Sequence, residues 1–138
     1  MDPRNAVTAG VHHVGLTVPN LTAAQSFFED ALGFQKIGAV DDYPAVFLSD
    51  QHIMLTLWQA KDPANATPFD RHQNLGLHHL SIRVADEVDL DGLHTKLTER
   101  DDVSIEFAPE ALGGGPTRHM MCAIPGGLRL ELIAPAAG

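Results

Sequence analysis

The sequence lacks several features of secreted, membrane-bound and nucleic-acid-binding proteins. Its single cysteine, Cys122, excludes an intramolecular disulfide and is typical of a reducing compartment. No apolar run approaches the roughly 18 residues that span a membrane, and the polar stretch 1–10 is unlike a signal peptide. Nine basic against eighteen acidic residues give a net charge of −9, which disfavours nucleic-acid binding. We therefore expect a soluble cytoplasmic protein that binds neither nucleic acid nor membrane.

The chain contains an internal repeat. The segment 10–18, GVHHVGLTV, recurs 66 residues later as 76–84, GLHHLSIRV. An amphipathic helical period follows each copy: the first begins at a capping-box pattern at 22–25 and ends before Gly33, and the second covers about 89–99 with Asp89 as its cap. At 138 residues the chain has the size of a single domain built from two such halves.

Three strand-like stretches follow each helix, separated by turn residues. Each half is therefore predicted to fold as βαβββ, which makes the fold class α+β. One domain, 1–138, would hold a first module at about 10–58, a linker at about 59–74 and a second module at about 75–134. The expected strands after the helices are 34–40, 45–48 and 52–58 in the first module and 103–107, 118–124 and 128–133 in the second.

Alternation along the strands separates a helix-packed face from an open face, because successive strand side chains point to opposite sides. The open face carries His13, His79 and Glu131. The alternation puts His12 and His78 in step with the helix-packed positions, so these two histidines are interpreted as structural. The apolar positions that define the helix side are Val14, Leu16 and Val18, then Leu80, Ile82 and Val84, then Leu128, Leu130 and Leu132.

Two histidines at repeated positions, with a carboxylate on the matching face, favour a metal site. A single strand histidine would more often be an ordinary hydrogen-bonded residue. Here His13 and His79 occupy the same place in each repeat, and Glu131 adds an oxygen donor. The sequence therefore predicts one divalent metal ion on His13, His79 and Glu131, with iron, manganese, zinc and nickel not distinguished.

These residues resemble the vicinal oxygen chelate superfamily, which includes glyoxalase I, methylmalonyl-CoA epimerase, fosfomycin and bleomycin resistance proteins and extradiol dioxygenases. The resemblance runs from His13-Val14-Gly15-Leu16-Thr17-Val18 to Gly127-Leu128-Arg129-Leu130-Glu131-Leu132. It implies two modules that form a curved mixed sheet around a metal cleft, with ligands from the first and last strands. Such proteins bind small substrates with neighbouring oxygen atoms, and related proteins commonly form homodimers, which we expect here.

The resemblance also places Thr56 where glyoxalase-like and epimerase-like sites have a carboxylate or amide ligand. Two histidines and one carboxylate remain, the facial triad of non-haem iron oxygenases, so a dioxygenase-type enzyme is the first expectation. Extradiol dioxygenases usually have a tyrosine at the position of Met121. His119, on the same strand, is a candidate acid-base residue besides Glu131. The candidates for substrate contacts are Thr56, Met54, Arg83 and Met121.

Two other functions stay open. A glyoxalase-like lyase or isomerase would use Glu131 as its base. A drug-binding resistance protein would not be an enzyme, although such modules usually lack the ligand set. Oxygen uptake with iron, turnover without oxygen, and ligand binding by the metal-free protein would separate the three.

Overall fold

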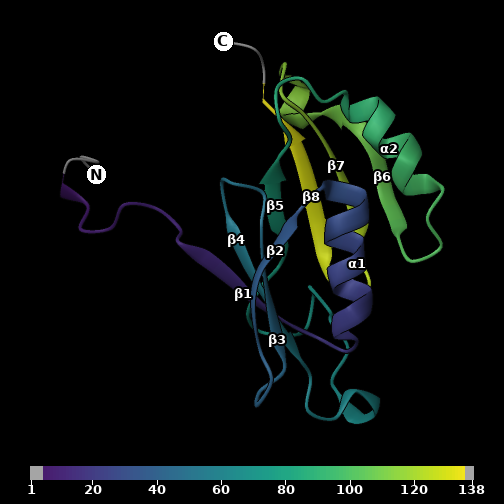
Figure 1. Cartoon of the computed structure of the whole chain (residues 1–138). Coiled ribbons are helices and arrows are strands. Elements are labelled where there is room, and N and C mark those ends of the chain that lie inside the picture. Colours follow the sequence, from purple (N-terminus) through teal and green to yellow (C-terminus); the bar gives the residue numbers. More distant parts are fainter. Residues whose placement is uncertain (1–4, 136–138) are drawn as a thin grey trace.

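The chain folds into two modules, each a four-stranded mixed sheet with one helix (Figure 1). A computed structural model describes residues 5–135. The predicted α+β class and the βαβββ order of both halves are confirmed. The first module contains β1 (His13–Val18), α1 (Leu21–Leu32), β2 (Gln35–Val40), β3 (Ala45–Ser49) and β4 (Met54–Gln59); the second contains β5 (Leu80–Arg83), α2 (Leu90–Thr98), β6 (Ser104–Ala111), β7 (Arg118–Ala123) and β8 (Arg129–Ala134).

Both sheets have the same topology and matching register. Their strand orders are β1-β4-β3-β2 and β5-β8-β7-β6, with the first strand parallel to the last and the remaining pairs antiparallel. Gly15 lies opposite Thr56 in the first sheet, and Ser81 lies opposite Glu131 in the second. Thr56 and Glu131 therefore occupy equivalent places, each in the last strand and beside the first.

The helix ends agree only in part with the sequence patterns. The capping box expected at 22–25 is wrong, because α1 begins two residues earlier and its cap is Asn20, whose side chain accepts a hydrogen bond from the Ala23 amide. Asp89 caps α2 as predicted and accepts from two amides. Gly33 ends α1 with a left-handed φ of 77°, which favours glycine.

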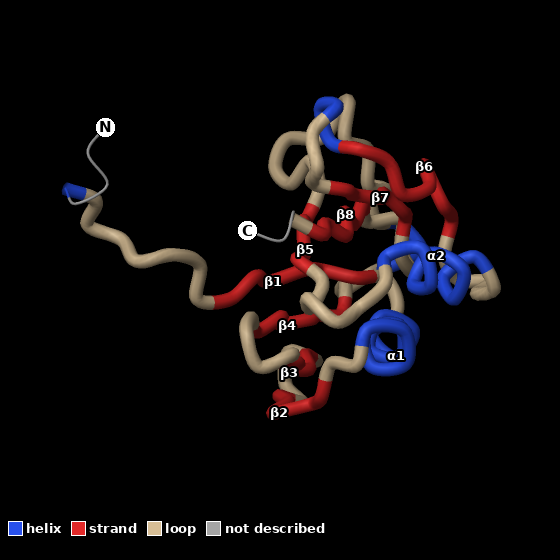
Figure 2. Tube along the Cα trace, turned by 90° about the horizontal axis from the view of Figure 1, so that it is seen from above, coloured by secondary structure: helices blue, strands red, loops and turns tan. Residues whose placement is uncertain are grey.

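One apolar core unites the two modules. It contains the helix-side residues of β1, β4, β5 and β8 together with buried residues of both helices, among them Phe27, Phe28 and Leu97. Figure 2 shows the strands in a curved row from β2 to β6, with both helices on its inner side. The core therefore lies between the two sheets and their helices, and the open faces of the sheets point outward.

Within one chain the two sheets remain separate. The edge strands are β1 and β2 in the first sheet and β5 and β6 in the second, and no closed barrel forms in the described residues. The segment before β1 leads away from the body (Figures 1 and 2), where Val7 and Val11 are exposed. No described helix has the length and apolarity needed to cross a membrane.

Candidate functional site

The open face of the second sheet carries a connected group of polar side chains centred on Glu131. This carboxylate is only 9% exposed on β8. Its Oε2 lies 2.6 Å from Nδ1 of His119 on the neighbouring strand, and its Oε1 lies 3.6 Å from Nε2 of His79. His119 is in turn held edge-on by the Phe107 ring, with centroids 4.9 Å apart. Strands β7 and β8 and the residue that precedes β5 therefore hold two imidazoles beside one carboxylate.

Burial and hydrogen bonding act in opposite directions on Glu131. Desolvation raises the pKa of its carboxyl. Hydrogen bonds from His119 and Ser81, together with the nearby charges, lower this pKa by more than desolvation raises it, so the pKa lies below the usual range. Glu131 is therefore ionised at neutral pH in spite of its burial. An ionised carboxylate is the form that binds a cation or accepts a proton.

Each His-His pair is in contact rather than divided between two faces. Nδ1 of His12 lies 2.9 Å from Nδ1 of His13, and the corresponding atoms of His78 and His79 are 2.8 Å apart. His12 lies just before β1, and His78 and His79 both lie just before β5, so strand alternation does not fix the direction of these three rings, and the structural role of His12 and His78 stays a prediction. The ring of His78 instead lies 3.4 Å from an Arg129 nitrogen.

The open face of the first sheet is more apolar. Thr56 is 5% exposed, and its hydroxyl accepts a hydrogen bond of 2.9 Å from the Trp58 indole. Tyr43 packs edge-on against Trp58, with ring centroids 4.9 Å apart. A side chain at Gly15 would place its Cβ 3.1 Å from the Thr56 hydroxyl oxygen, so glycine keeps this place accessible. His13 lies on the edge strand beside it and is exposed.

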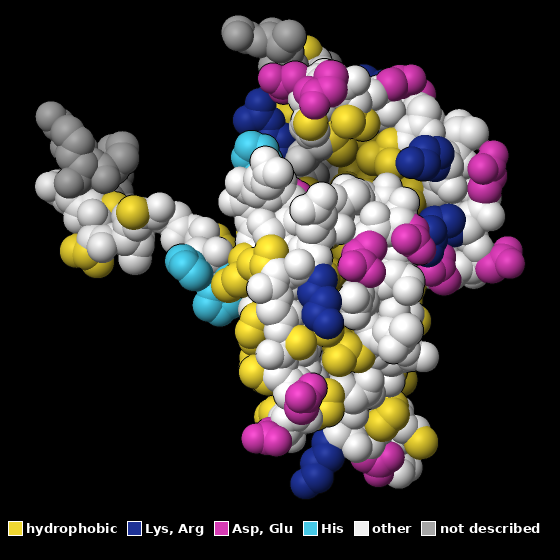
Figure 3. All heavy atoms as spheres, viewed as in Figure 1, with side chains coloured by type: hydrophobic (Ala, Val, Ile, Leu, Met, Phe, Trp, Pro, Cys, Tyr) yellow, Lys and Arg dark blue, Asp and Glu magenta, His cyan; other side chains and the backbone are white. Residues whose placement is uncertain are grey.

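The structure brings together two of the three predicted metal ligands. His79 and Glu131 are neighbours at the second sheet, whereas His13 begins β1 of the first sheet and contacts His12. Figure 3 likewise shows histidine side chains at separate places on the molecule. Among residues 5–135, no three histidine, cysteine, aspartate or glutamate side chains are arranged to hold an ion. The donor types of His79 and Glu131 fit a divalent metal, and within residues 5–135 His13 is not part of their group.

The remaining predicted contact residues lie in different surroundings. Met121 is buried opposite Glu131 on the neighbouring strand, and Met54 lies opposite His13 in the first sheet. Arg83 is exposed and pairs with Asp86 at 3.3 Å. Met121 and Met54 therefore border the two parts of the predicted site, whereas Arg83 is engaged outside the group around Glu131.

A second polar group, which the sequence reasoning missed, adjoins the first. Arg129 makes a two-pronged contact with Glu106, at 2.8 and 2.6 Å, and Arg71 of the linker reaches the same carboxylate at 2.5 Å. The two arginines lower the pKa of Glu106 to about 2. Alternation along β8 puts Arg129 on the same face as Glu131, so the sequence could have indicated its place. Nothing in the spacing of the sequence indicated that Arg71 would reach Glu106.

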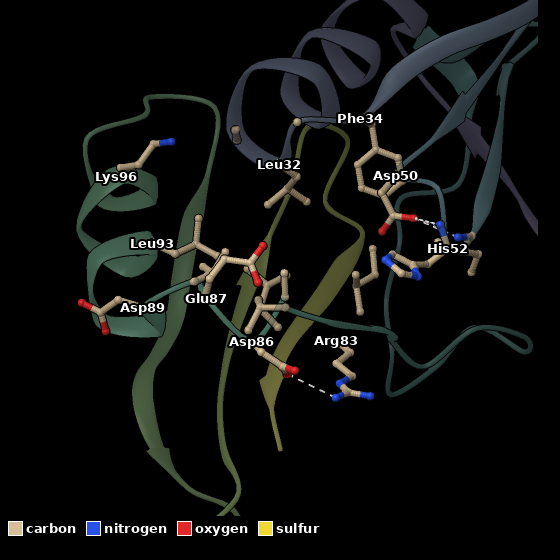
Figure 4. Close-up of a pocket in the computed structure, with 18 of the residues that line it drawn as sticks. Leu32, Phe34, Asp50, His52, Arg83, Asp86, Glu87, Asp89, Leu93 and Lys96 are labelled. Carbon is tan, nitrogen blue, oxygen red and sulfur yellow. Dashed lines mark hydrogen bonds and ion pairs between the residues drawn. The ribbon is translucent and has the colours of Figure 1, made fainter. Parts of the chain in front are cut away.

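A hollow of about 1200 Å³ between the modules lies away from this chemistry. Figure 4 shows Leu32, Phe34, Leu93, Glu87 and Asp86 among the residues that line it. None of His13, His79, His119 and Glu131 lines it. Volume alone is therefore a poor guide here, and the buried ionised carboxylate with its two imidazoles is the better candidate site.

Comparisons with known proteins agree with this fold. A family model described as "Glyoxalase/Bleomycin resistance protein/Dioxygenase superfamily" matches residues 10–132. A 2-epi-5-epi-valiolone epimerase from Actinomyces sp. is 29% identical over 150 aligned positions, which cover 93% of this chain and 80% of that protein.

Two solved structures have the same fold. A glyoxylase/bleomycin resistance protein/dioxygenase domain from Frankia sp. EAN1pec superposes with a TM-score of 0.79 at 22% identity, covering 95% of each chain. A lactoylglutathione lyase from Agrobacterium tumefaciens has a TM-score of 0.69 at 20% identity, covering 94% of this chain and 96% of its own. At these identities the two structures establish the architecture and leave the reaction open.

Proposed function

The chain belongs to the glyoxalase/bleomycin resistance protein/dioxygenase superfamily, and from this membership we propose that it is a metal-dependent isomerase. It would move a proton beside the carbonyl group of a small hydroxylated substrate. The observation that carries the proposal is Glu131, a carboxylate that is buried yet ionised and is held by His119 and Ser81. Similarity to a protein named as an epimerase supports the same chemistry.

The proposed reaction inverts one carbon atom next to a carbonyl. Glu131 takes the proton from that carbon, and the electron pair of the C–H bond moves toward the carbonyl oxygen. The pair then returns to the carbon, which takes a proton from a water molecule on its opposite face, and Glu131 releases its own proton to solvent. His119 holds the carboxylate through its Nδ1 and keeps it oriented. A divalent ion held by His79 and Glu131 would stabilise the negative charge on the carbonyl oxygen.

We further propose that the active protein is a homodimer in which each site combines two chains. His13 of one copy would join His79 and Glu131 of the other, with the open face of a first sheet set against the open face of a second. The outward direction of both faces, the incomplete donor set in one chain and the exposed aromatic surface around Tyr43 support this arrangement.

Turnover tests the reaction directly. Protein loaded with zinc, manganese, nickel or iron is incubated with 2-epi-5-epi-valiolone in deuterated water, and NMR follows both the configuration and the hydrogen at the carbon beside the carbonyl. Inversion with deuterium incorporation is the expected result. Absence of both with every metal, in protein whose metal content is verified, would refute the isomerase proposal for this substrate class.

Mixing two inactive variants tests the shared site. His13→Ala and Glu131→Ala each damage both sites of their own homodimer. In a mixed dimer, one site receives intact His13 from one chain and intact Glu131 from the other, so random pairing should restore about a quarter of wild-type activity. If each site lies within one chain, the mixture stays inactive. Sedimentation should show a dimer, and a monomer would contradict the arrangement.

A dioxygenase is the second candidate, and Thr56 favours it. The Thr56 hydroxyl is already bonded to Trp58, so the position equivalent to Glu131 supplies no carboxylate and leaves the two-histidine, one-carboxylate set of non-haem iron oxygenases. Protein purified without oxygen, loaded with Fe(II) and given a catechol should then consume oxygen. Oxygen uptake without isomerase turnover would replace the first proposal with this one.

A further inference from the structure

A small hollow beside the candidate site is formed by the linker and the open face of the second sheet. It measures about 500 Å³, within the range of pockets that bind small molecules. The linker contributes residues 67–72 and Asn74, β6 contributes Glu106, and Arg129 comes from β8. Arg129 lies two residues before Glu131 on the same strand face, a spacing of roughly 7 Å. A molecule whose reacting carbon met Glu131 would extend into this hollow.

Internal hydrogen bonds fix the shape of the linker at this place. The Asn74 side chain donates to the Pro68 carbonyl at 2.6 Å, and the Asn74 amide donates to the Asp70 carbonyl at 2.9 Å. The Asp70 side chain accepts from the His72 amide. The bond between Arg71 and Glu106 attaches the linker to β6. The linker therefore forms a defined wall of the hollow.

The lining combines hydrogen-bonding groups of both signs with an apolar part. The positive charges of Arg71 and Arg129 are balanced by the negative charges of Asp70 and Glu106, so the lining is neutral overall when His72 is neutral. Phe69 contributes an aromatic ring. Paired donors and acceptors next to an aromatic surface suit a neutral ring with several hydroxyl groups, whereas an anion would meet two carboxylates.

We propose that this hollow is a subsite for the hydroxyl groups of a neutral, polyhydroxylated ring, with Arg71 and Glu106 as its specificity-determining residues. The proposal rests on the proposed function, since it assigns the non-reacting part of the same substrate. Hydroxyl groups would bond the edges of the guanidinium and carboxylate groups that the Arg71–Glu106 and Arg129–Glu106 pairs leave free, and a substrate without hydroxyl groups would gain none of these hydrogen bonds.

The subsite is tested with myo-inositol, a neutral cyclitol without a carbonyl group that cannot be isomerised. Titration calorimetry on the metal-loaded protein should show inositol binding in preference to inorganic phosphate. Arg71→Ala should weaken inositol binding tenfold or more, because a charged hydrogen bond is lost. Arg118→Ala, which removes an arginine from an ion pair with Asp91 elsewhere, should change it less than twofold.

Glu106→Gln provides the sharper variant, because it changes the charge of the lining by one unit and keeps the side-chain size. Phosphate binding should appear and inositol binding should fall. The subsite proposal is overturned if the wild type does not bind inositol, if phosphate binds it better, or if Arg71→Ala binds inositol as the wild type does. Inositol binding without any isomerase turnover would instead reject the proposed reaction and retain the subsite. Elemental analysis should show equal metal content in all variants.

Discussion

The two modules differ far more on their open faces than in their folds. In the first sheet Gly15 lies opposite Thr56, and the Thr56 hydroxyl is bonded to an indole. In the second sheet Ser81 lies opposite Glu131, and the serine supports the carboxylate. At equivalent positions of the two sheets, the first module therefore has the neutral hydroxyl of Thr56 and the second has the hydrogen-bonded carboxylate of Glu131.

The comparison teaches which constraints the fold imposes. The helix-side residues of both modules enter one core, so each position must remain apolar and well packed. The open faces point outward and are free to specialise. The second module holds an ordered set of acids, imidazoles and arginines, whereas the first supplies an aromatic surface and the exposed His13. We expect the second module to carry the reacting groups and the first module to cover them. The following variants test this division of roles.

Glu131→Ala should have the largest effect. Loss of a base that is also a ligand should lower turnover by about a thousandfold, within the range for general acid-base groups, and should sharply reduce metal content. Kinetics and elemental analysis measure the two effects. Glu99→Ala, which removes an exposed carboxylate at the end of α2, is the control. Full metal stoichiometry in Glu131→Ala would show that the second module does not carry the site.

His119→Ala should have the next largest effect, because it removes the group that orients Glu131. Loss of such an outer partner typically costs 10- to 100-fold, so we expect a decrease of about that size in kcat. His119→Gln retains a hydrogen-bonding side chain and should recover part of the activity. A His119→Ala enzyme with wild-type kcat and an unchanged pH profile would contradict an orienting role.

Acid should weaken the second module through its paired carboxylates. The pKa of Glu106 is lowered to about 2, and hydrogen bonds from arginines lower those of Asp91 and Asp102. A lowered folded-state pKa gives stability that is complete above the ordinary carboxyl pKa and is lost as the pH falls, for Glu106 between about 4.5 and 2.

The substitution Glu106→Gln removes the stability that the ionised Glu106 carboxylate contributes to the folded state. The carboxylate is partly exposed to solvent, so its contribution at neutral pH is discounted to about 1 kcal/mol. Hydrogen exchange between pH 5 and pH 3 should show opening of β6, β7 and β8 in the wild type and a smaller pH dependence in the variant. Equal pH dependence in both proteins would show that Glu106 does not govern acid sensitivity.

The helix caps give a smaller contrast in the same direction. Asp89 accepts hydrogen bonds from two amides of α2 and places a negative charge at the helix start, whereas Asn20 accepts from one amide of α1. Asp89→Ala should therefore lower the free energy of unfolding by about 1 kcal/mol, and Asn20→Ala by about 0.5 kcal/mol. Urea denaturation measures both values, and the reverse order would contradict the argument.

The fold could be predicted from the sequence because its signals are local and repeated. Alternation in β1, β5 and β8 identified the core faces, and Asp89 marked a helix start. The cap of α1 was misplaced because Thr22 to Gln25 fits a capping box as well as Asn20 fits a simple cap. Local hydrogen-bond competition decided between them, which no periodicity reveals.

The site could be predicted only in part. Alternation along a strand predicts which face of the sheet a side chain occupies, but it does not predict which residues lie beside that side chain. His79 and Glu131 lie close together, with 3.6 Å between His79 Nε2 and Glu131 Oε1, although His79 stands just before β5. Alternation could not show that both open faces lie on the outer side of one curved row of strands (Figure 2), since that depends on how both helices pack into one core. It also failed to reveal Arg71, whose contact with Glu106 closes a long linker loop.

Thr56→Val should have the smallest effect, and it tests whether the first module lacks a ligand at this position. The substitution keeps the shape of a buried side chain and removes the hydroxyl that accepts from the Trp58 indole. Trp58 is the single tryptophan and is partly exposed, so water can replace the lost acceptor and the cost should be about 0.5 kcal/mol. Intrinsic fluorescence should shift, because the indole changes its hydrogen-bond partner. Metal affinity should stay within twofold of the wild type, since a neutral hydroxyl is a poor ligand beside an ionised carboxylate. If Thr56→Val loses metal as Glu131→Ala does, then Thr56 is a ligand and the two modules share the coordination equally.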